Sequence, residues 1–185
     1  TWYHNHDMSG IADICGNLWE WTGGMRLMDG EIQIIPYGNS MKIDCDMSAN
    51  STLWKAIMPD GTLVEPGTAG TLKVDGTGAT NFTPRINTSV NYQTTGEGSG
   101  NIDFKSLKAA DGVNIPNLLI AMGLFPEESA TYGGDRFYMR NHGERLPFRG
   151  SAFGDASNSG ASALSLSNPR SYSRDHVGFR SAFYE

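Results

Sequence analysis

Short apolar runs separated by glycine-containing turns dominate the pattern of the chain. The stretch EIQIIPYGN (31–39) predicts a strand that stops at Pro36 and turns at Gly38–Asn39. Residues 53–67 predict a β-hairpin, because two apolar segments flank the Asp60–Gly61 pair. Residues 70–101 alternate threonine with apolar residues between glycines, which predicts one or two exposed strands followed by a loop.

Two segments carry a helical spacing of apolar residues. In residues 102–112 these positions fall roughly on one face, and Gly112 stops the pattern. In residues 114–126, Pro116 occupies the first turn, where its missing N–H does no harm. From Phe137 onward the pattern returns to short strands. We therefore expect an α+β fold with much irregular structure, in a single domain spanning 1–185.

Composition removes several classes of function. The 185 residues carry a net charge of −6 and nine scattered arginines, which argues against a nucleic-acid partner. No apolar run approaches the roughly 20 residues that a membrane helix needs, so we expect no membrane insertion. Cys15 and Cys45 are interpreted as two buried thiols, with a disulfide between them as the alternative. Because the chain starts at Thr1 without a methionine, we expect an upstream part to precede it.

Three phrases are rich in aromatic residues and arginine: GNLWEW (16–21), RLPFRG (145–150) and VGFRSAF (177–183). Two tryptophans on either side of a glutamate bury a large area, and their N–H groups still need partners. In this order the phrases resemble the version of the C-type lectin fold found in formylglycine-generating enzymes. The resemblance implies that 40–135 is a long central insertion. It also implies that the scaffold aromatics are buried, namely Trp19, Trp21, Phe148 and Phe179.

The chemistry of that fold family divides into several branches. The oxidase branch holds copper on a pair of cysteines, but residues 146–185 contain no cysteine. This absence argues against the copper chemistry. A metal-dependent oxidase stays the weaker alternative, because the HNHD stretch (4–7) holds a close pair of histidines that could bind a metal. The calcium motifs of sugar-binding lectins are absent as well: SNPR (167–170) has no carboxylate.

The chain most resembles the variable proteins of diversity-generating retroelements, found in bacteriophages and gut bacteria. This resemblance implies a non-catalytic protein without cofactor or metal, located on a virion tail or a bacterial surface. It implies a macromolecular ligand, protein or glycan, on a bacterial cell, and a variable region at 150–178. A fixed structural tail domain is the remaining alternative.

The segment 151–176 has an unusual composition. Mutagenesis of adenines in asparagine codons cannot produce Lys, Glu, Gln, Met or Trp. These types supply 27 of the 185 residues, so about four are expected in a window of this length, and none is present. A serine-rich loop has the same bias, and composition alone does not separate the two explanations.

Alternation in 163–170 places Leu164 and Leu166 toward the core and the intervening residues outward. Residues 152–158 and 172–176 are expected to form neighbouring loops on the same open face. The side chains with the reach to dominate binding are those of residues 172 and 174–176. The predicted ligand-binding residues are Ala152, Gly154, Asp155, Ser157, Asn158, Ala163, Ser165, Tyr172, Arg174, Asp175 and His176.

Overall fold

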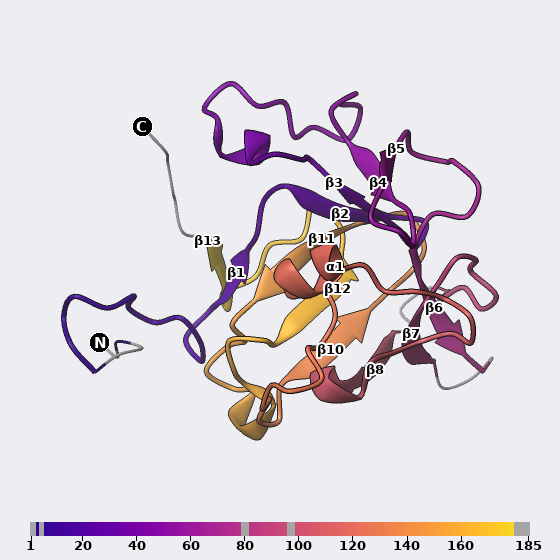
Figure 1. Ribbon diagram of the computed structural model, residues 1–185. Coiled ribbons are helices and arrows are strands. Elements are labelled where there is room, and N and C mark those ends of the chain that lie inside the picture. The colour runs from indigo at the N-terminus through magenta and orange to yellow at the C-terminus, as the bar shows by residue number, and fades with distance from the viewer. Residues whose placement is uncertain (1–2, 4–5, 79–81, 96–98, 180–185) are drawn as a thin grey trace.

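A curled sheet of mixed strand direction forms the body of the protein (Figure 1). The computed structural model describes residues 3, 6–78, 82–95 and 99–179. In this part of the chain thirteen strands join one sheet, whose main path runs β8-β10-β12-β11-β2-β3-β6-β7-β9. The protein is mainly β, with 31% strand and 8% helix.

One half of the sheet comes from the first ninety residues. β2 and β3 form a tight antiparallel hairpin, because Asp29 and Gly30 both take the positive φ that a two-residue turn requires. The predicted strand at 31–39 and the predicted hairpin at 53–67 are confirmed by β3, β4 and β5. The strands expected after residue 70 are β6 and β7, but they are mostly buried rather than exposed, because both contribute side chains to the larger core cluster. The bounds are β2 Met25–Met28, β3 Glu31–Ile34, β4 Lys55–Ile57, β5 Leu63–Val64, β6 Lys73–Thr77 and β7 Thr83–Asn87.

The other half of the sheet contains β8 (Gly100–Asp103), β10 (Arg136–Met139), β11 (Glu144–Arg149) and β12 (Leu164–Asn168). The prediction of a helix at 102–112 is wrong. Its residues form β8, the 3-10 turn η2 (Phe104–Ser106) and β9 (Lys108–Ala109). Strand pairing outweighs the helical spacing of the apolar residues here: β8 pairs antiparallel with β10, and β9 pairs parallel with β7.

Helical structure is sparse in the described residues. The helix expected at 114–126 exists as the short α1 (Asn117–Ala121), which Pro116 precedes and Gly123, at φ +64°, terminates. The remaining helical pieces are 3-10 turns, including η1 (Asn39–Met41) and η3 (Ala156–Asn158). The expected α+β class is therefore confirmed only in its β-rich part.

The three aromatic and arginine-containing phrases meet in space. β1 (Trp19–Trp21) pairs antiparallel with β11 and parallel with β13 (Val177–Phe179). In Figure 1, β1 and β13 lie side by side although they come from opposite ends of the chain. The described parts of the phrases form one continuous three-stranded unit, in which large side chains on neighbouring strands pack against one another.

Two hydrophobic clusters fill the molecule. The larger lies between α1 and the sheet and contains Leu164 and Leu166, as predicted for that face of β12. The smaller surrounds Phe148 and Trp19, so the predicted burial of these two rings is confirmed. The predicted burial of Trp21 is not confirmed: its ring is half-buried, because it packs against Phe148 but also lines a cavity. The prediction for Phe179 is wrong, since this ring is 80% exposed at the end of β13, whose only described pairing is with β1.

Segments 40–135 and the rest of the chain share the sheet. β4 and β6, from 40–135, pair with β3, and β8 pairs with β10. That 40–135 is an insertion remains a prediction. Cys15 and Cys45 are both free and half-buried, so the alternative of a disulfide is excluded and the thiols are less buried than expected. Within the described part of the chain, no helix has the length and apolar character to cross a membrane.

Candidate functional site

A polar cavity of about 280 Å³ lies where the loops after β11 and before β13 meet the sheet. We call it the polar cavity. Six of its ten lining residues belong to the segment 150–178, although they are far apart within it. Strand β12 brings three of them, and the flanking loops bring the others. The lining consists of Trp19, Ser99, Tyr138, Phe148, Asp155, Ser165, Ser167, Asn168, Tyr172 and His176.

Aromatic rings form the inner wall of the polar cavity. Trp19 packs edge-on against Tyr138, with 6.2 Å between centroids, and Phe148 lies 5.7 Å from Tyr172. Behind them, Trp21 meets Phe148 edge-on at 3.9 Å. Such contacts add to the energy of burial and hold each ring in one orientation. The wall is therefore rigid, because β1, β10 and β11 position it.

Polar groups stand above this wall. The Asp155 carboxylate accepts a hydrogen bond of 2.6 Å from the backbone N–H of Ala152, which fixes the loop that leads into η3. Burial raises the pKa of Tyr138, and the negative charge of Asp155 raises it further. The Ser167 hydroxyl is buried and has no hydrogen-bond partner among the described residues. An unpaired buried hydroxyl is costly, and a ligand that pairs with it recovers that cost.

The loop before β13 carries the side chains with the longest reach. The guanidinium of Arg174 lies 5.6 Å from the centre of the Tyr172 ring, within the range of a cation–π contact. His176 Nδ1 and Asp175 Oδ1 are 3.0 Å apart, and the Asp175 side chain is 96% exposed. Hydrogen bonding to His176 is the main reason that the pKa of Asp175 is lowered. These groups form a charged rim next to the half-buried Tyr172.

The predicted binding residues occupy three kinds of position, and Ser165 belongs to the first and the third. Asp155, Ser165, Tyr172 and His176 line the polar cavity. Exposed side chains around it come from residues 157, 158, 174 and 175, and Gly154 has no atom within 4 Å of where a Cβ would stand. The third group was predicted to face outward and is buried: Ala152 at 6%, Ala163 at 0% and Ser165 at 7% exposure.

The correction for these three residues has one cause. The alternation in 163–170 identified the face of β12 that meets the larger cluster, but the opposite face is covered as well. Ala163 and Ala152 belong to the smaller aromatic cluster, and Ser165 faces Phe148 across the β11–β12 pair. A strand between two clusters buries both of its faces. Ser165 still reaches the polar cavity at the edge of this cluster.

Sequence reasoning missed several members of the site. Ser167 and Asn168 line the cavity at the end of β12, and Tyr138 and Ser99 come from outside 150–178. Phe153 does not line the cavity, but it is 77% exposed in the loop after β11. The sequence signal for it is a single phenylalanine within a segment of small residues. Such a residue contributes to binding when it is exposed.

One arginine of the segment belongs to the scaffold. Arg170 donates to both carboxylate oxygens of Glu144, at 3.0 and 2.9 Å. Arg26 donates to the same carboxylate at 2.9 Å and stacks 4.4 Å from the ring centre of Trp54. Burial alone raises the pKa of Glu144, but these hydrogen bonds lower it more. Arg170 thus ties the loop after β12 to strand β11.

In the described part of the chain, no three histidine, cysteine, aspartate or glutamate side chains gather around a point where a metal ion fits. His4, of the HNHD stretch, lies outside the described residues. No known family model matches the sequence, and no curated protein is significantly similar to it.

Proposed function

We propose that this chain is a non-catalytic ligand-binding protein with a C-type lectin-like fold, and that a retroelement diversifies its segment 150–178. The proposal places it on a phage or prophage particle, or on a bacterial surface, where it binds a protein or glycan of a bacterial cell. One observation carries it: six of the ten residues that line the polar cavity come from this segment.

The fold proposal rests on how the motif phrases pair. The resemblance to formylglycine-generating enzymes used three phrases at 16–21, 145–150 and 177–183. Described parts of all three are neighbours through β1, β11 and β13. A fold in which the two ends of the domain are held together leaves the loops between β11 and β13 free to differ.

The proposal of diversification rests on composition and exposure together. Residues 151–176 contain no Lys, Glu, Gln, Met or Trp. Around the cavity, residues 154, 157, 158 and 174 are exposed, so side chains of other sizes fit there without a change in the core. The buried positions 163, 164 and 166 lie in the same segment, and we expect them to stay constant in sequence variants of this protein.

Binding by one copy is expected to be weak. Tyr172 and Arg174 are the residue types that most often dominate interfaces, and the remaining rim is made of small residues. Several copies on one particle raise the effective affinity by about 10²–10⁴ without any new contact.

Two experiments test the proposal. Sequencing the locus should find a reverse transcriptase gene next to a near-copy of the segment that encodes 150–178, and its absence contradicts diversification. For binding, beads coated with the protein are incubated with a panel of bacterial strains that includes the source community.

We expect the beads to bind some strains and the single protein to bind much less. Tyr172→Ala combined with Arg174→Ala should abolish bead binding. Tyr92→Ala combined with Lys105→Ala removes one tyrosine and one cation from exposed positions elsewhere and should leave it unchanged. Equal loss in both double variants contradicts the proposed site.

A further inference from the structure

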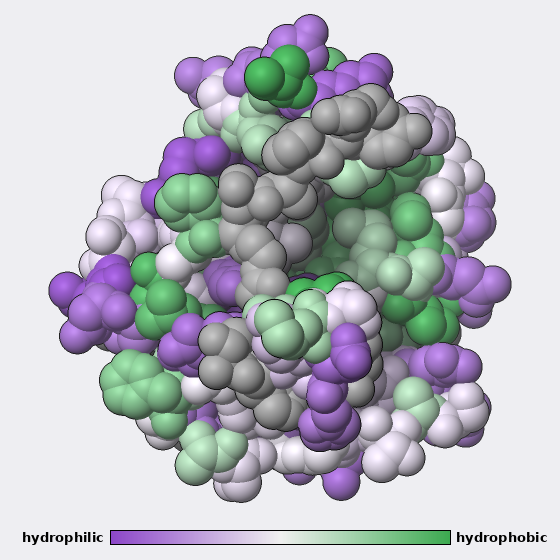
Figure 2. All heavy atoms as spheres, turned by 90° about the vertical axis from the view of Figure 1, so that its left-hand side faces the viewer, coloured by the Kyte–Doolittle hydropathy of each residue, from purple (hydrophilic) through white to green (hydrophobic). Residues whose placement is uncertain are grey.

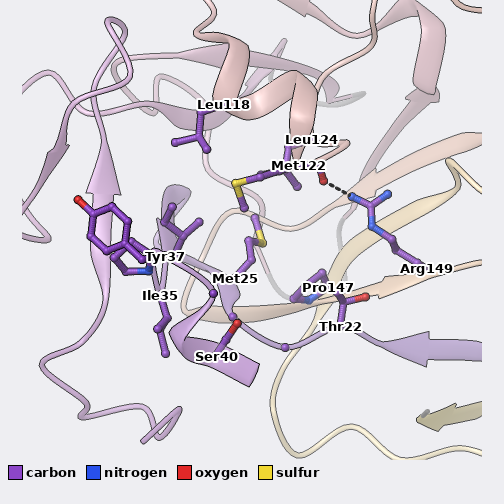
Figure 3. Close-up of a pocket in the computed structure, with 15 residues that line it drawn as sticks. Thr22, Met25, Ile35, Tyr37, Ser40, Leu118, Met122, Leu124, Pro147 and Arg149 are labelled. Carbon is purple, nitrogen blue, oxygen red and sulfur yellow. Dashed lines mark hydrogen bonds between the residues drawn. The ribbon is translucent and has the colours of Figure 1, made fainter. Parts of the chain in front are cut away.

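A second cavity, of about 300 Å³, opens on the other side of β11. We call it the apolar cavity. Figure 2 shows a hollow with hydrophobic walls on the face that carries β1, and Figure 3 shows the side chains that form it. The lining comes from β2, β3, α1, β11 and the loops beside them. It consists of Thr22, Gly23, Gly24, Met25, Ile34, Ile35, Pro36, Tyr37, Gly38, Ser40, Leu118, Met122, Leu124, Pro147 and Arg149.

The apolar cavity is framed by regular structure. Met25 and Ile34 are paired across the β2–β3 hairpin, and Leu118 and Met122 project from the region of α1. Gly24, at φ +81°, lets the chain turn close to Ser40, where a Cβ would come within 2.5 Å of the hydroxyl oxygen. Strands β2, β3 and β11 and helix α1 therefore form part of the wall, and the loops beside them form the rest.

Arg149 is the only charged residue in this lining. Its Nη2 donates to the backbone carbonyls of Met122 and Gly123, at 3.0 and 2.8 Å. Its Nε and Nη1 have no acceptor in the described part of the chain. Glu20 lies opposite Arg149 in the β1–β11 register. Burial lowers the pKa of Arg149, and no neighbouring carboxylate opposes this.

A half-buried guanidinium beside apolar walls attracts an anion, because a charged hydrogen bond is stronger where water is partly excluded. Among the described residues that line the cavity none is acidic, which leaves room for the anion of a ligand beside Arg149. The walls favour a ligand that is otherwise apolar. The cavity volume lies at the lower end of the range for small-molecule sites, about 300–1,000 Å³.

We propose that the apolar cavity binds a small aliphatic monocarboxylate, with its carboxylate on Nη1 of Arg149 and its chain between Met25, Leu118 and Met122. A single cation matches one negative charge, whereas a phosphate brings a second charge and a larger desolvation cost. Arg149 and Tyr37 stand at opposite ends of the cavity in Figure 3. A neighbouring cavity, of about 560 Å³, shares Tyr37 and Leu118 and gives room for the end of a longer chain.

This site is separate from the one under Proposed function. Phe148 faces the polar cavity and Arg149 faces the apolar cavity, because consecutive residues of a strand point to opposite sides. The two sites therefore respond to different substitutions.

The test uses three probes of equal chain length: octanoate, octanol and octylamine. Binding to the full chain is measured by calorimetry at neutral pH. One charge-assisted hydrogen bond predicts that octanoate binds at least about tenfold more tightly than octanol, and that octylamine binds most weakly. Equal affinities for octanoate and octanol, or no heat from octanoate at millimolar concentration, overturn the proposal.

Two variants locate the site. Leu118→Trp fills the cavity without touching Arg149, and Arg149→Gln removes the charge. Each should weaken octanoate binding at least about tenfold. Because Arg149 also holds two carbonyls, its variant is interpreted only together with Leu118→Trp. Tyr172→Ala, in the polar cavity, should bind octanoate like the original protein. Undiminished binding by Leu118→Trp overturns the assignment, whatever the outcome at the polar cavity.

Discussion

Strand β11 separates two cavities of opposite character. On the side of Phe148, aromatic rings carry a rim of serine, asparagine, aspartate and histidine. On the side of Arg149, aliphatic side chains and methionines surround a single cation. Two consecutive residues thus contribute to two unrelated sites, because the backbone of a strand directs neighbouring side chains to opposite faces.

Substitutions of the residues that form the two cavities are expected to differ in their effect on the stability of the fold. Several walls of the apolar cavity belong to the larger core cluster, including Met25, Ile34 and Leu124. A change there alters the packing of the whole sheet. Around the polar cavity, residues 157, 158, 174 and 175 are exposed and project from loops. A binding surface can therefore change its side chains without loss of stability only where those side chains do not also pack in the core.

The largest expected effect on stability comes from replacing Phe148, the ring at the centre of the smaller cluster. Phe148 is 1% exposed and packs against Trp21 and Tyr172. Phe148→Ala should lower the free energy of unfolding by about 3–5 kcal/mol, measured by urea denaturation. Phe153→Ala removes an equal ring that is 77% exposed and should change it by less than about 0.5 kcal/mol. Similar losses in both variants would show that Phe148 is not part of the core.

A second pair of variants separates constant from changeable positions inside 150–178. Ala163 is fully buried, whereas Gly154 has open space around the position of a Cβ. Ala163→Asn should destabilise the protein by about 2–3 kcal/mol, because the added amide is too large and lacks partners. Gly154→Asn should keep the stability within about 0.5 kcal/mol. Thermal and urea unfolding of both variants test this, and a tolerant Ala163 would remove the distinction.

Sequence reasoning found the strands better than the helices. The segments 31–39 and 53–67 carry strong turn residues, so local chemistry alone determines their structure. Residues 102–112 have helical spacing, but pairing with β10 and β7 overrides it. A local pattern does not encode pairing with a strand that lies about 20 to 40 residues away in the sequence.

Only part of the candidate site could be predicted from the sequence, because the rest also depends on contacts between distant segments. Composition drew attention to 151–176, and alternation placed Leu164 and Leu166 in the core. The burial of Ala163 depends on a second aromatic cluster on the opposite face, which becomes visible only once β1, β11 and β13 are paired. The apolar cavity had no sequence signal, since its residues come from four separate stretches of the chain.

The ion pair between Arg170 and Glu144 is expected to make a smaller, pH-dependent contribution to stability. The pKa of Glu144 is lowered in the folded protein, since hydrogen bonds from Arg170 and Arg26 outweigh the effect of burial. Its contribution to stability is therefore present above the ordinary glutamate pKa and is lost as the pH falls through the folded value. Arg170→Ala should cost about 1 kcal/mol at neutral pH and less in acid. Urea unfolding between pH 3 and pH 7 measures both. An equal cost at every pH would show that Arg170 acts through packing instead.

The smallest expected effect concerns Tyr138 and Asp155, on the two sides of the polar cavity. Burial raises the pKa of Tyr138 and the charge of Asp155 raises it further, while Arg136 opposes this. Asp155→Asn should lower the pKa of Tyr138 and leave it above the ordinary value, because burial remains. The asparagine oxygen is still able to accept the hydrogen bond from Ala152, so the loop keeps its shape.

The sign of the linked stability change follows from this raised pKa. A folded tyrosine that retains its proton contributes stability below the unfolded pKa and loses it as the pH rises through the folded pKa. Asp155→Asn should therefore reduce the alkaline loss of stability. Titration of the Tyr138 ring carbon by NMR measures the pKa directly. Asp175→Asn is the control, because that exposed carboxylate does not contribute to the shift of Tyr138. An unchanged Tyr138 in Asp155→Asn would mean that the two groups do not share the cavity, and the loop before η3 would no longer belong to the site.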